Sequence, residues 1–171
     1  MPQIKIREWN EKPRTKLRFV KIGDIFCYQF SEEMFVFGQI LGKVNVGHVI
    51  QFFDIFQASP TITVEELSRA QFIGKPIIVD SYTLFDRSPV WSWQIIGHQA
   101  DFDPSPFKDL AFKWGDPNGL QFGKVWLDGR TEPKIFSREE VEDLDWEACV
   151  GSIVYNRILE EELARRGNKG V

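Results

Sequence analysis

The chain has 171 residues, of which 43% are hydrophobic and 27% charged, a composition typical of a soluble globular domain with a sizeable core. No uncharged apolar run reaches the roughly 18 residues of a membrane-spanning helix, and the charged N-terminus lacks the apolar stretch of a secretory signal. We therefore expect a cytoplasmic protein with no membrane partner. The 15 Phe and 6 Trp residues predict a core or a contact surface built from large rings.

The charge is unevenly distributed, although the net charge of the whole chain is only −4. Residues 1–21 carry seven basic and two acidic side chains, a net of +5, which leaves −9 for the other 150 residues. We expect a basic N-terminal arm over residues 1–20, followed by a single α+β domain over residues 21–171. The acidic body disfavours nucleic-acid binding, because contacts from Lys and Arg to phosphates supply most of that affinity.

The segment after the arm predicts an antiparallel meander. Three stretches rich in aromatic and β-branched residues, 24–30, 34–42 and 48–56, are separated by polar or glycine-containing turns. Within the second stretch, Gly38 predicts a bulge or bend where the sheet curls, while Gln39 falls on the opposite face. We therefore expect a curled, SH3-like or barrel-like sheet. The less favoured interpretation of Gly38 is that it admits a ligand close to the backbone.

The middle of the chain predicts a short helix and further strands. Thr63 and Glu66 have the spacing of a capping box for a helix within residues 59–70. The turn residues Asp116–Gly119 separate two strand-like stretches. The remaining expected elements are strands over 75–85 and 89–97 and a strand–turn–strand unit over 107–129.

A helix is also expected at the C-terminal end. Ser137 and Glu140 have the spacing of a helix start, and a helix is predicted from about Asp145 to about Arg166, ending at Gly167. Its apolar stripe is expected to consist of Trp146, Cys149, Val150 and Ile153.

The search for catalytic motifs is largely negative. No phosphate-binding loop, nucleophile elbow or paired metal-ligand spacing is present. His48 and His98 could each act as a general base, but packed or surface imidazoles are favoured. Asp54 would be a catalytic carboxylate or, more favoured, a partner of a backbone N–H. Cys27 and Cys149 are expected as reduced, buried thiols. We predict a protein that is not an enzyme and binds no metal or cofactor.

The densest acidic cluster is the favoured partner-binding surface. A solvated helix start and an electronegative patch for a basic partner explain it equally well. We expect Trp9 to serve as an exposed aromatic anchor. The acidic candidates are Glu139, Glu140, Glu142, Asp143 and Asp145, with Glu147 extending the cluster.

The order of these motifs resembles a bacterial family. The chain contains Phe19 before "GDIF" (23–26), then "FVFGQILG", "FFDIF", "WQIIG", "VWLDG" and a helix bearing a tryptophan. This order resembles the one seen in the immunity protein 26 family of polymorphic toxin systems. The resemblance spans residues 19 to about 160. It implies a small cytoplasmic α+β protein that binds a cognate toxin and catalyses no reaction. The matched positions, which would be mainly scaffold, are Gly23, Asp24, Phe26, Gly38, Phe53, Asp54, Trp93 and Gly97.

Under this resemblance, the protein would act by covering the active site or substrate path of its toxin, and an acidic body suits a basic toxin such as a nuclease. Relatives carry a basic residue where this chain has Gln39, so the resemblance implies no role for that position. One alternative is an RNA-cleaving toxin of the MazF/PemK kind, but residues 24–56 contain only Lys43 as a cation and no arginine. Another is an SH3-like nucleic-acid-binding module that uses residues 1–21. A third is a relative that no longer faces a toxin.

Overall fold

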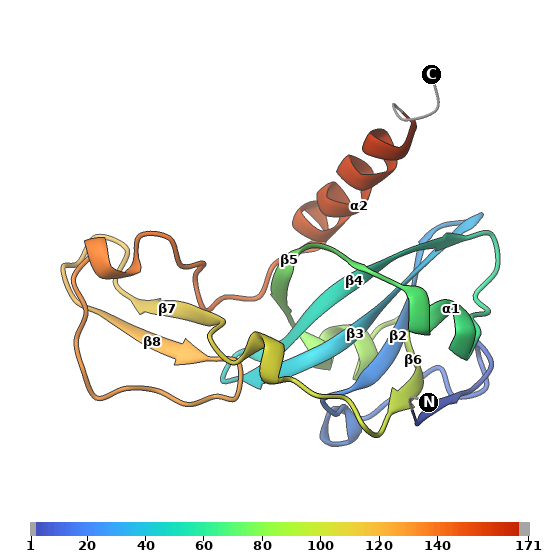
Figure 1. Cartoon of the computed structure of the whole chain (residues 1–171), viewed down its shortest axis with the longest axis horizontal. Helices are drawn as coiled ribbons and strands as arrows, with labels where there is room; N and C mark the ends of the chain where they lie inside the picture. Colours follow the sequence, from blue (N-terminus) through green and yellow to red (C-terminus); the bar gives the residue numbers. More distant parts are fainter. Residues whose placement is uncertain (1–2, 168–171) are drawn as a thin grey trace.

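The structure is a computed structural model that describes residues 3–167. The strands of its larger sheet are β1 (Ile4–Ile6), β2 (Asp24–Ser31), β3 (Met34–Val44), β4 (Gly47–Gln57), β5 (Phe72–Val79) and β6 (Trp93–Gln99). They pair antiparallel in the order β1-β6-β2-β3-β4-β5, so that β1 and β5 are the edge strands and the curled sheet is not closed (Figure 1). A two-stranded ribbon of β7 (Ala111–Gly115) and β8 (Phe122–Trp126) lies beyond one end of this sheet (Figure 1). The α+β class is confirmed.

The predicted meander is present as β2, β3 and β4, and β3 is irregular at Gly38. Its pairing with β4 shifts register between Val36 and Gly38. A Cβ atom at Gly38 would overlap the ring of Phe26 and lie 2.5 Å from the carbonyl oxygen of Gln51. The absence of a side chain therefore lets two neighbouring strands pack closely, and the space in front of this glycine is filled by the protein's own ring.

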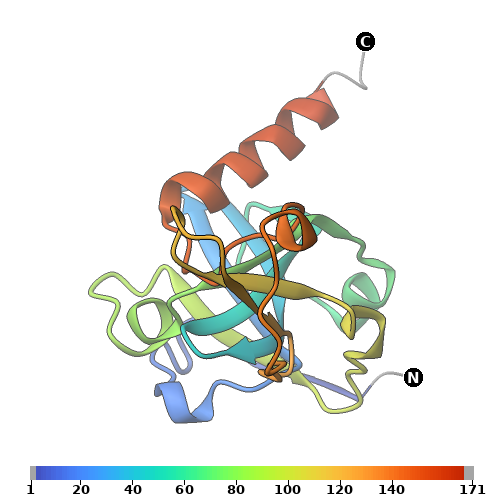
Figure 2. The same cartoon turned by 90° about the vertical axis from the view of Figure 1, so that its left-hand side faces the viewer.

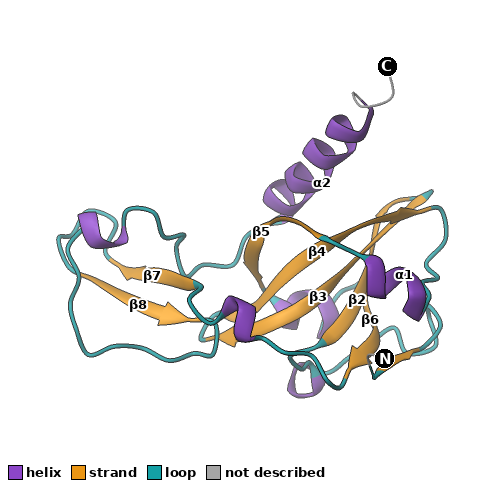
Figure 3. Ribbon diagram, viewed as in Figure 1, coloured by secondary structure: helices purple, strands orange, loops and turns teal. Residues whose placement is uncertain are grey.

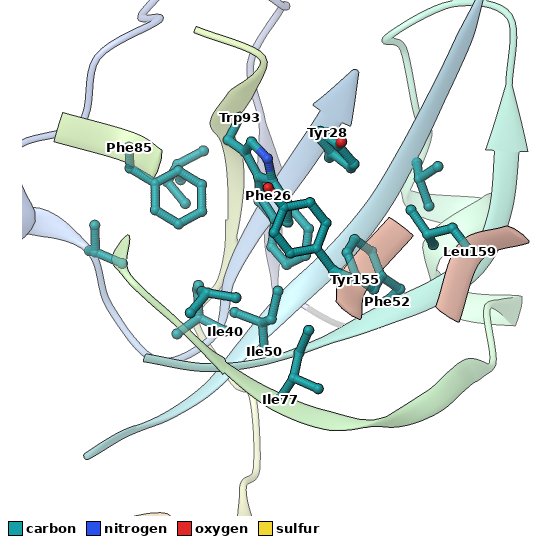
Figure 4. Packing of buried hydrophobic residues seen from close by; sticks show 14 of the residues in the cluster. Phe26, Tyr28, Ile40, Ile50, Phe52, Ile77, Phe85, Trp93, Tyr155 and Leu159 are labelled. Atoms are coloured by element: carbon teal, nitrogen blue, oxygen red, sulfur yellow. The ribbon is translucent and has the colours of Figure 1, made fainter. Parts of the chain in front are cut away.

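One face of the sheet packs around an aromatic cluster with Trp93 at its centre (Figure 4). The indole ring stacks on Tyr28 with the ring centroids 4.4 Å apart. Four further rings have centroids 5.1–6.1 Å from it, namely Phe26, Phe52, Phe85 and Tyr155. Each such pair adds about 0.5–1.5 kcal/mol beyond the buried area, so the ring contacts of this cluster contribute to the stability of the core.

The opposite face is covered by α1 (Val64–Arg69), the predicted middle helix. Its capping box is confirmed, since the Thr63 hydroxyl accepts a hydrogen bond from the Glu66 N–H at 3.1 Å. In return, the Glu66 carboxylate accepts one from the Thr63 N–H at 2.7 Å. Leu67 anchors this short helix in the core. Figure 3 shows that strands make up most of the body and that the helices other than the C-terminal one are short.

The strand predicted over 75–85 has the wrong bounds. β5 ends earlier because the Asp80 carboxylate accepts hydrogen bonds from the N–H groups of Tyr82 and Thr83, at 3.1 and 3.2 Å, and a helical turn follows. Pro76 lies inside β5 rather than at its boundary. An edge strand with an interrupted register tolerates the missing N–H at that point.

The strand predicted over 89–97 also begins later than expected. Trp91 has a φ of 50°, a left-handed conformation that no strand accommodates. Its N–H donates to Ser88 Oγ at 3.1 Å and its carbonyl accepts from Gln94 Nε2 at 3.0 Å, which fixes a turn. Trp91 and Trp93 therefore do not share a strand face, and only Trp93 is buried.

The C-terminal helix α2 (Ser152–Gly167) is confirmed, but it begins later than predicted. Residues 145–150 form an irregular, bent segment instead, and backbone hydrogen bonds hold them against β7 and β5. Figure 2 shows α2 running outward from the sheet. Its buried side chains include Tyr155 and Leu159, which join the cluster around Trp93. The apolar stripe expected from Trp146, Cys149, Val150 and Ile153 is therefore wrong.

Residues 3–20, the described part of the expected basic arm, lie against the sheet. β1 pairs with β6 as an added edge strand. Asn10 exchanges hydrogen bonds with Gln94 at 3.0 and 2.8 Å, and Arg14 forms an ion pair with Asp86 at 2.7 Å. This segment is thus anchored at several points, while the division of the chain at residue 20 stays a prediction.

Candidate functional site

The β7–β8 ribbon and the chain that returns from it form a separate projection, residues 111–151, which we term the lobe (Figure 1). The predicted strand–turn–strand unit is confirmed here, with the Gly119 N–H donating to the Asp116 carbonyl at 2.9 Å. A small core of its own holds the lobe together and consists of Phe122, Phe136, Val141 and Leu144. A second cluster, including Phe112 and Leu127, joins it to the sheet.

The basic side chains of the lobe lie on its own aromatic rings. The lobe contains nine acidic and five basic residues. Lys124 and Lys134 lie over Phe136, with the Nζ atoms 4.2 and 4.6 Å from the ring centroid. The other three cation–ring pairs are Lys113–Trp146, Arg130–Trp126 and Arg138–Phe122. Because these contacts hold the cations against the lobe, the surplus of acids dominates its outer surface.

Half of the acidic cluster has structural partners. Glu140 forms an ion pair with Lys134 at 2.6 Å and accepts a hydrogen bond from the Ser137 N–H at 2.8 Å, and these contacts lower its pKa to about 2. Only one 3-10 turn follows, rather than the predicted helix. Asp145 forms an ion pair with Lys75 at 2.6 Å. The Glu147 carboxylate accepts a hydrogen bond from the backbone between β3 and β4.

Glu139, Glu142 and Asp143 are the free members of the cluster. All three are exposed, and none forms an ion pair with any residue in the described part of the chain. They lie within five residues on the 3-10 turn and just after it, so their charges add to one negative electrostatic potential. This group is the part of the predicted site that is available to a partner.

Large apolar side chains are exposed beside these acids. Leu120 at the tip of the ribbon is 81% exposed and Ile135 is 61% exposed. Trp114 and Ile135 line a shallow hollow of about 390 Å³ in the lobe. Trp146 is also partly exposed on the same lobe. Apolar side chains bordered by charges are typical of a protein–protein contact surface.

Trp9, the other predicted contact residue, lies elsewhere. It is half-buried, and its ring packs edge-on against Phe35 with the centroids 5.4 Å apart. Phe35 is the second residue of β3, whereas Asn45 just beyond the end of that strand contacts Glu147. At about 3.3 Å per strand residue, Trp9 and the acidic cluster are roughly 30 Å apart. The structure does not bring them into one site.

His48 is a buried structural residue. Its Nδ1 lies 2.9 Å from the hydroxyl of Ser81, which is also buried. Burial, with a smaller contribution from Lys43, lowers the pKa of His48 to about 4, so the ring is neutral near pH 7. This Ser–His pair has the composition of a catalytic dyad, and both of its side chains are buried.

His98 joins a second polar cluster at the start of β2. Its Nδ1 lies 2.9 Å from Asp24 Oδ1, while the other Asp24 oxygen accepts a hydrogen bond from the Lys21 N–H at 2.8 Å. Burial raises the pKa of the Asp24 carboxyl against the effect of these hydrogen bonds. Gln39 is buried nearby and donates to Gln99 Oε1 at 3.0 Å. The position where relatives are expected to be basic is therefore part of the interior here.

Asp54 has the structural role that the sequence favours. It is half-buried, and its Oδ1 accepts a hydrogen bond from the Gln71 N–H at 2.8 Å, which ties β4 to the start of β5. Both cysteines are free thiols. Cys27 is buried, as predicted, and burial raises the pKa of its thiol. Cys149 is exposed, so the prediction of a buried thiol is wrong at this position.

Residues 3–167 contain no group of three or more His, Cys, Asp or Glu side chains arranged to hold a metal ion. No helix in the same range is long and apolar enough to cross a membrane.

Comparison with known proteins gives one match. The model of a family described as Immunity protein 26 matches residues 21–123, which is more than half of the chain. Neither the search of curated proteins nor the search of solved structures found a significant match. The matched region contains the meander, α1, β5 to β7 and the start of β8, and it ends before the acidic cluster.

Proposed function

Because the chain belongs to the immunity protein 26 family, we propose that it binds and neutralises a cognate bacterial toxin through the lobe and catalyses no reaction itself. Binding would take place in the cytoplasm of the producing cell, where the toxin must be kept inactive. The immunity role follows from the family, while the contact surface and the mode of inhibition are inferred from the geometry of the lobe.

The observation that carries the choice of surface is the placement of Glu139, Glu142 and Asp143. These three acids are free and exposed, whereas every basic side chain of the lobe lies over a ring. Apolar side chains next to them can supply the contact energy that charges alone do not. A lobe of this kind suits a toxin with a basic surface, such as a nuclease.

The proposed mechanism is occlusion. A typical stable interface buries about 800 Å² on each partner, which a projecting lobe can supply without rearrangement of the sheet. Inserted at or beside the toxin's catalytic cleft, the lobe would block access of a polyanionic substrate both sterically and by its own negative charge.

The extent of the family match supports a scaffold role for the sheet and a contact role for the lobe. The matched residues 21–123 contain the core positions Phe26, Gly38 and Trp93, which build the scaffold. The acidic cluster and α2 lie outside the match. The matched range therefore covers the sheet and the first part of the lobe, while the acidic group proposed to recognise the toxin lies beyond it.

The test is co-expression with the toxin encoded beside the gene. The variant to compare is Glu139→Lys combined with Glu142→Lys and Asp143→Lys. Glu140 stays unchanged, because it holds Lys134 and the Ser137 N–H. We expect this variant to lose protection, and the association rate to fall about tenfold or more at low salt.

The matched control places the same three charge reversals elsewhere, at Glu32, Glu33 and Glu160. These residues are exposed and lie outside the lobe. The control should protect cells as the wild type does. Equal protection and equal association rates for both triple variants would show that the acidic group is only a solubilising face.

A further inference from the structure

A short segment of the lobe, residues 145–150, is fixed between two strands, and we term it the strap (Figure 1). On one side, Lys113 of β7 donates to the Asp145 carbonyl at 2.8 Å and accepts from the Glu147 N–H at 2.7 Å. On the other, the Val150 N–H donates to the Ile78 carbonyl of β5 at 2.8 Å. Hydrogen bonds at both ends make the strap a rigid element rather than a loose loop.

The strap, β5 and the first turn of α2 enclose a pocket of about 290 Å³. Its lining is mainly apolar and includes Pro76, Ile78, Phe112, Trp146 and Val154. A benzene ring occupies an apolar cavity of roughly 150 Å³ in other proteins, so this pocket can hold a side chain the size of Leu or Phe. A preformed apolar pocket on rigid elements is the usual receptor for an anchor side chain in a protein interface.

The charged residues that line the pocket or adjoin its lining, which we term the rim, comprise three acids and two cations. Asp145 lines the pocket and is paired with Lys75, and Lys113 lies over the ring of Trp146. Glu147 and Asp80 adjoin the lining without being part of it, and neither has a cationic partner in the described part of the chain. Asp80 is close enough to contribute to the raised pKa of the Cys149 thiol, after burial as the larger cause. The rim therefore favours a cation beside the apolar side chain that enters.

We propose that this pocket receives an apolar side chain of the toxin, and that a lysine or arginine next to it in the toxin displaces Lys75 from Asp145. The inference rests on the proposed function, to which it adds the anchor point and the chemistry of the partner's contact segment. A second copy of this chain is a poor occupant, because it would bring another acidic lobe against the acidic rim.

Two substitutions test the pocket with the toxin. Ala148→Phe fills it from its own lining and should weaken toxin binding about thirtyfold or more, as expected for a blocked anchor. Its control is Val90→Phe, which introduces the same ring at an exposed position outside the pocket and should bind normally. Thermal unfolding of both variants checks that the fold is intact.

Lys75→Met frees Asp145 and should strengthen binding about two- to fivefold, the range for an exposed ion pair. Arg69→Met changes the net charge equally and frees Glu65 instead, on α1 and outside both the lobe and the pocket. It should give a smaller gain, because it changes only the long-range attraction. Equal gains from both variants would contradict the displacement step.

A peptide probe tests the pocket without the toxin. Acetyl-Lys-Phe-Lys-amide should shift the indole N–H signal of Trp146 saturably in a ¹H–¹⁵N spectrum, with the signal assigned from Trp146→Phe. Acetyl-Glu-Phe-Glu-amide and acetyl-Lys-Gly-Lys-amide should not, and Ala148→Phe should abolish the shift.

The outcomes separate the two levels of inference. If the toxin binds Ala148→Phe normally and the lysine peptide causes no saturable shift, the pocket assignment is wrong and the proposed function stands. If the wild type does not bind the toxin at all, the proposed function fails, while the peptide result still decides whether the pocket takes a cation-flanked apolar side chain. A dimer that Ala148→Phe disrupts would identify a second copy as the occupant and overturn the proposal.

Discussion

The phenyl ring of Phe26 lies where the side chain of any residue larger than glycine at position 38 would be. Gly38→Ala should therefore force the ring away from the centre of the core, at a cost of about 1–3 kcal/mol in the free energy of unfolding. Gly151→Ala is the matched control, because a Cβ there would meet no atom within 4 Å. Urea unfolding of both variants checks this, and equal midpoints would show that the core can absorb the extra methyl group.

Replacing Trp93 by alanine should mainly lower stability, whereas replacing Trp114 by alanine should mainly weaken toxin binding. Trp93 is buried among five rings, so Trp93→Ala should cost about 3–5 kcal/mol of stability. Trp114 is 48% exposed on the lobe, and Trp114→Ala should change stability by less than about 1 kcal/mol while weakening toxin binding. Unfolding curves and binding titrations on the two variants measure both quantities. A large loss of stability in Trp114→Ala would mean that this ring is a core residue of the lobe rather than a contact.

Local signals were sufficient for the parts of the fold that depend on neighbouring residues. Thr63 and Glu66 lie three residues apart, and their capping box forms as their spacing indicates. Asp116 and Gly119 close their turn in the same way. The end of β5 could also have been found locally, since Asp80 caps the N–H of Tyr82 only two residues away.

Residues far apart in sequence decide the parts that were predicted wrongly. The strap has a helical pattern of apolar residues, but Lys113 and Ile78 bind its backbone and hold it in an irregular, non-helical conformation. The acidic cluster is visible in the sequence, yet its division into paired and free members depends on partners such as Lys75, 70 residues from Asp145. A pocket formed by three elements leaves no pattern in any one of them.

Substituting the cations of the N-terminal segment tests whether the protein binds nucleic acid or acts as an immunity protein. Deleting residues 1–20 would also remove β1 and the ion pair between Arg14 and Asp86, so it would confuse binding with folding. Substituting the exposed cations Lys12, Lys16 and Arg18 by Gln avoids this, because none of them is in an ion pair in the described part of the chain.

We expect the triple Gln variant to protect cells normally and to unfold within about 1 kcal/mol of the wild type. Arg14→Gln is the comparison, and it should destabilise the protein more, because it leaves the Asp86 carboxylate without its ion pair. Binding of the wild type to single-stranded RNA, with a steep dependence on salt and loss in the triple variant, would favour the nucleic-acid module instead.

The buried pair of His48 and Ser81 predicts a specific loss of stability in acid. The pKa of His48 is about 4 in the folded protein against an ordinary value of 6.5, so between these values the unfolded chain binds more protons than the folded one. Stability should therefore be complete above about pH 6.5 and fall by up to about 3 kcal/mol as the pH approaches 4. His48→Gln, which can still hydrogen-bond Ser81, should flatten this part of the pH profile. Urea unfolding at several pH values measures the slopes, and parallel profiles for the wild type and His48→Gln would show that the imidazole is hydrated and free to protonate in place.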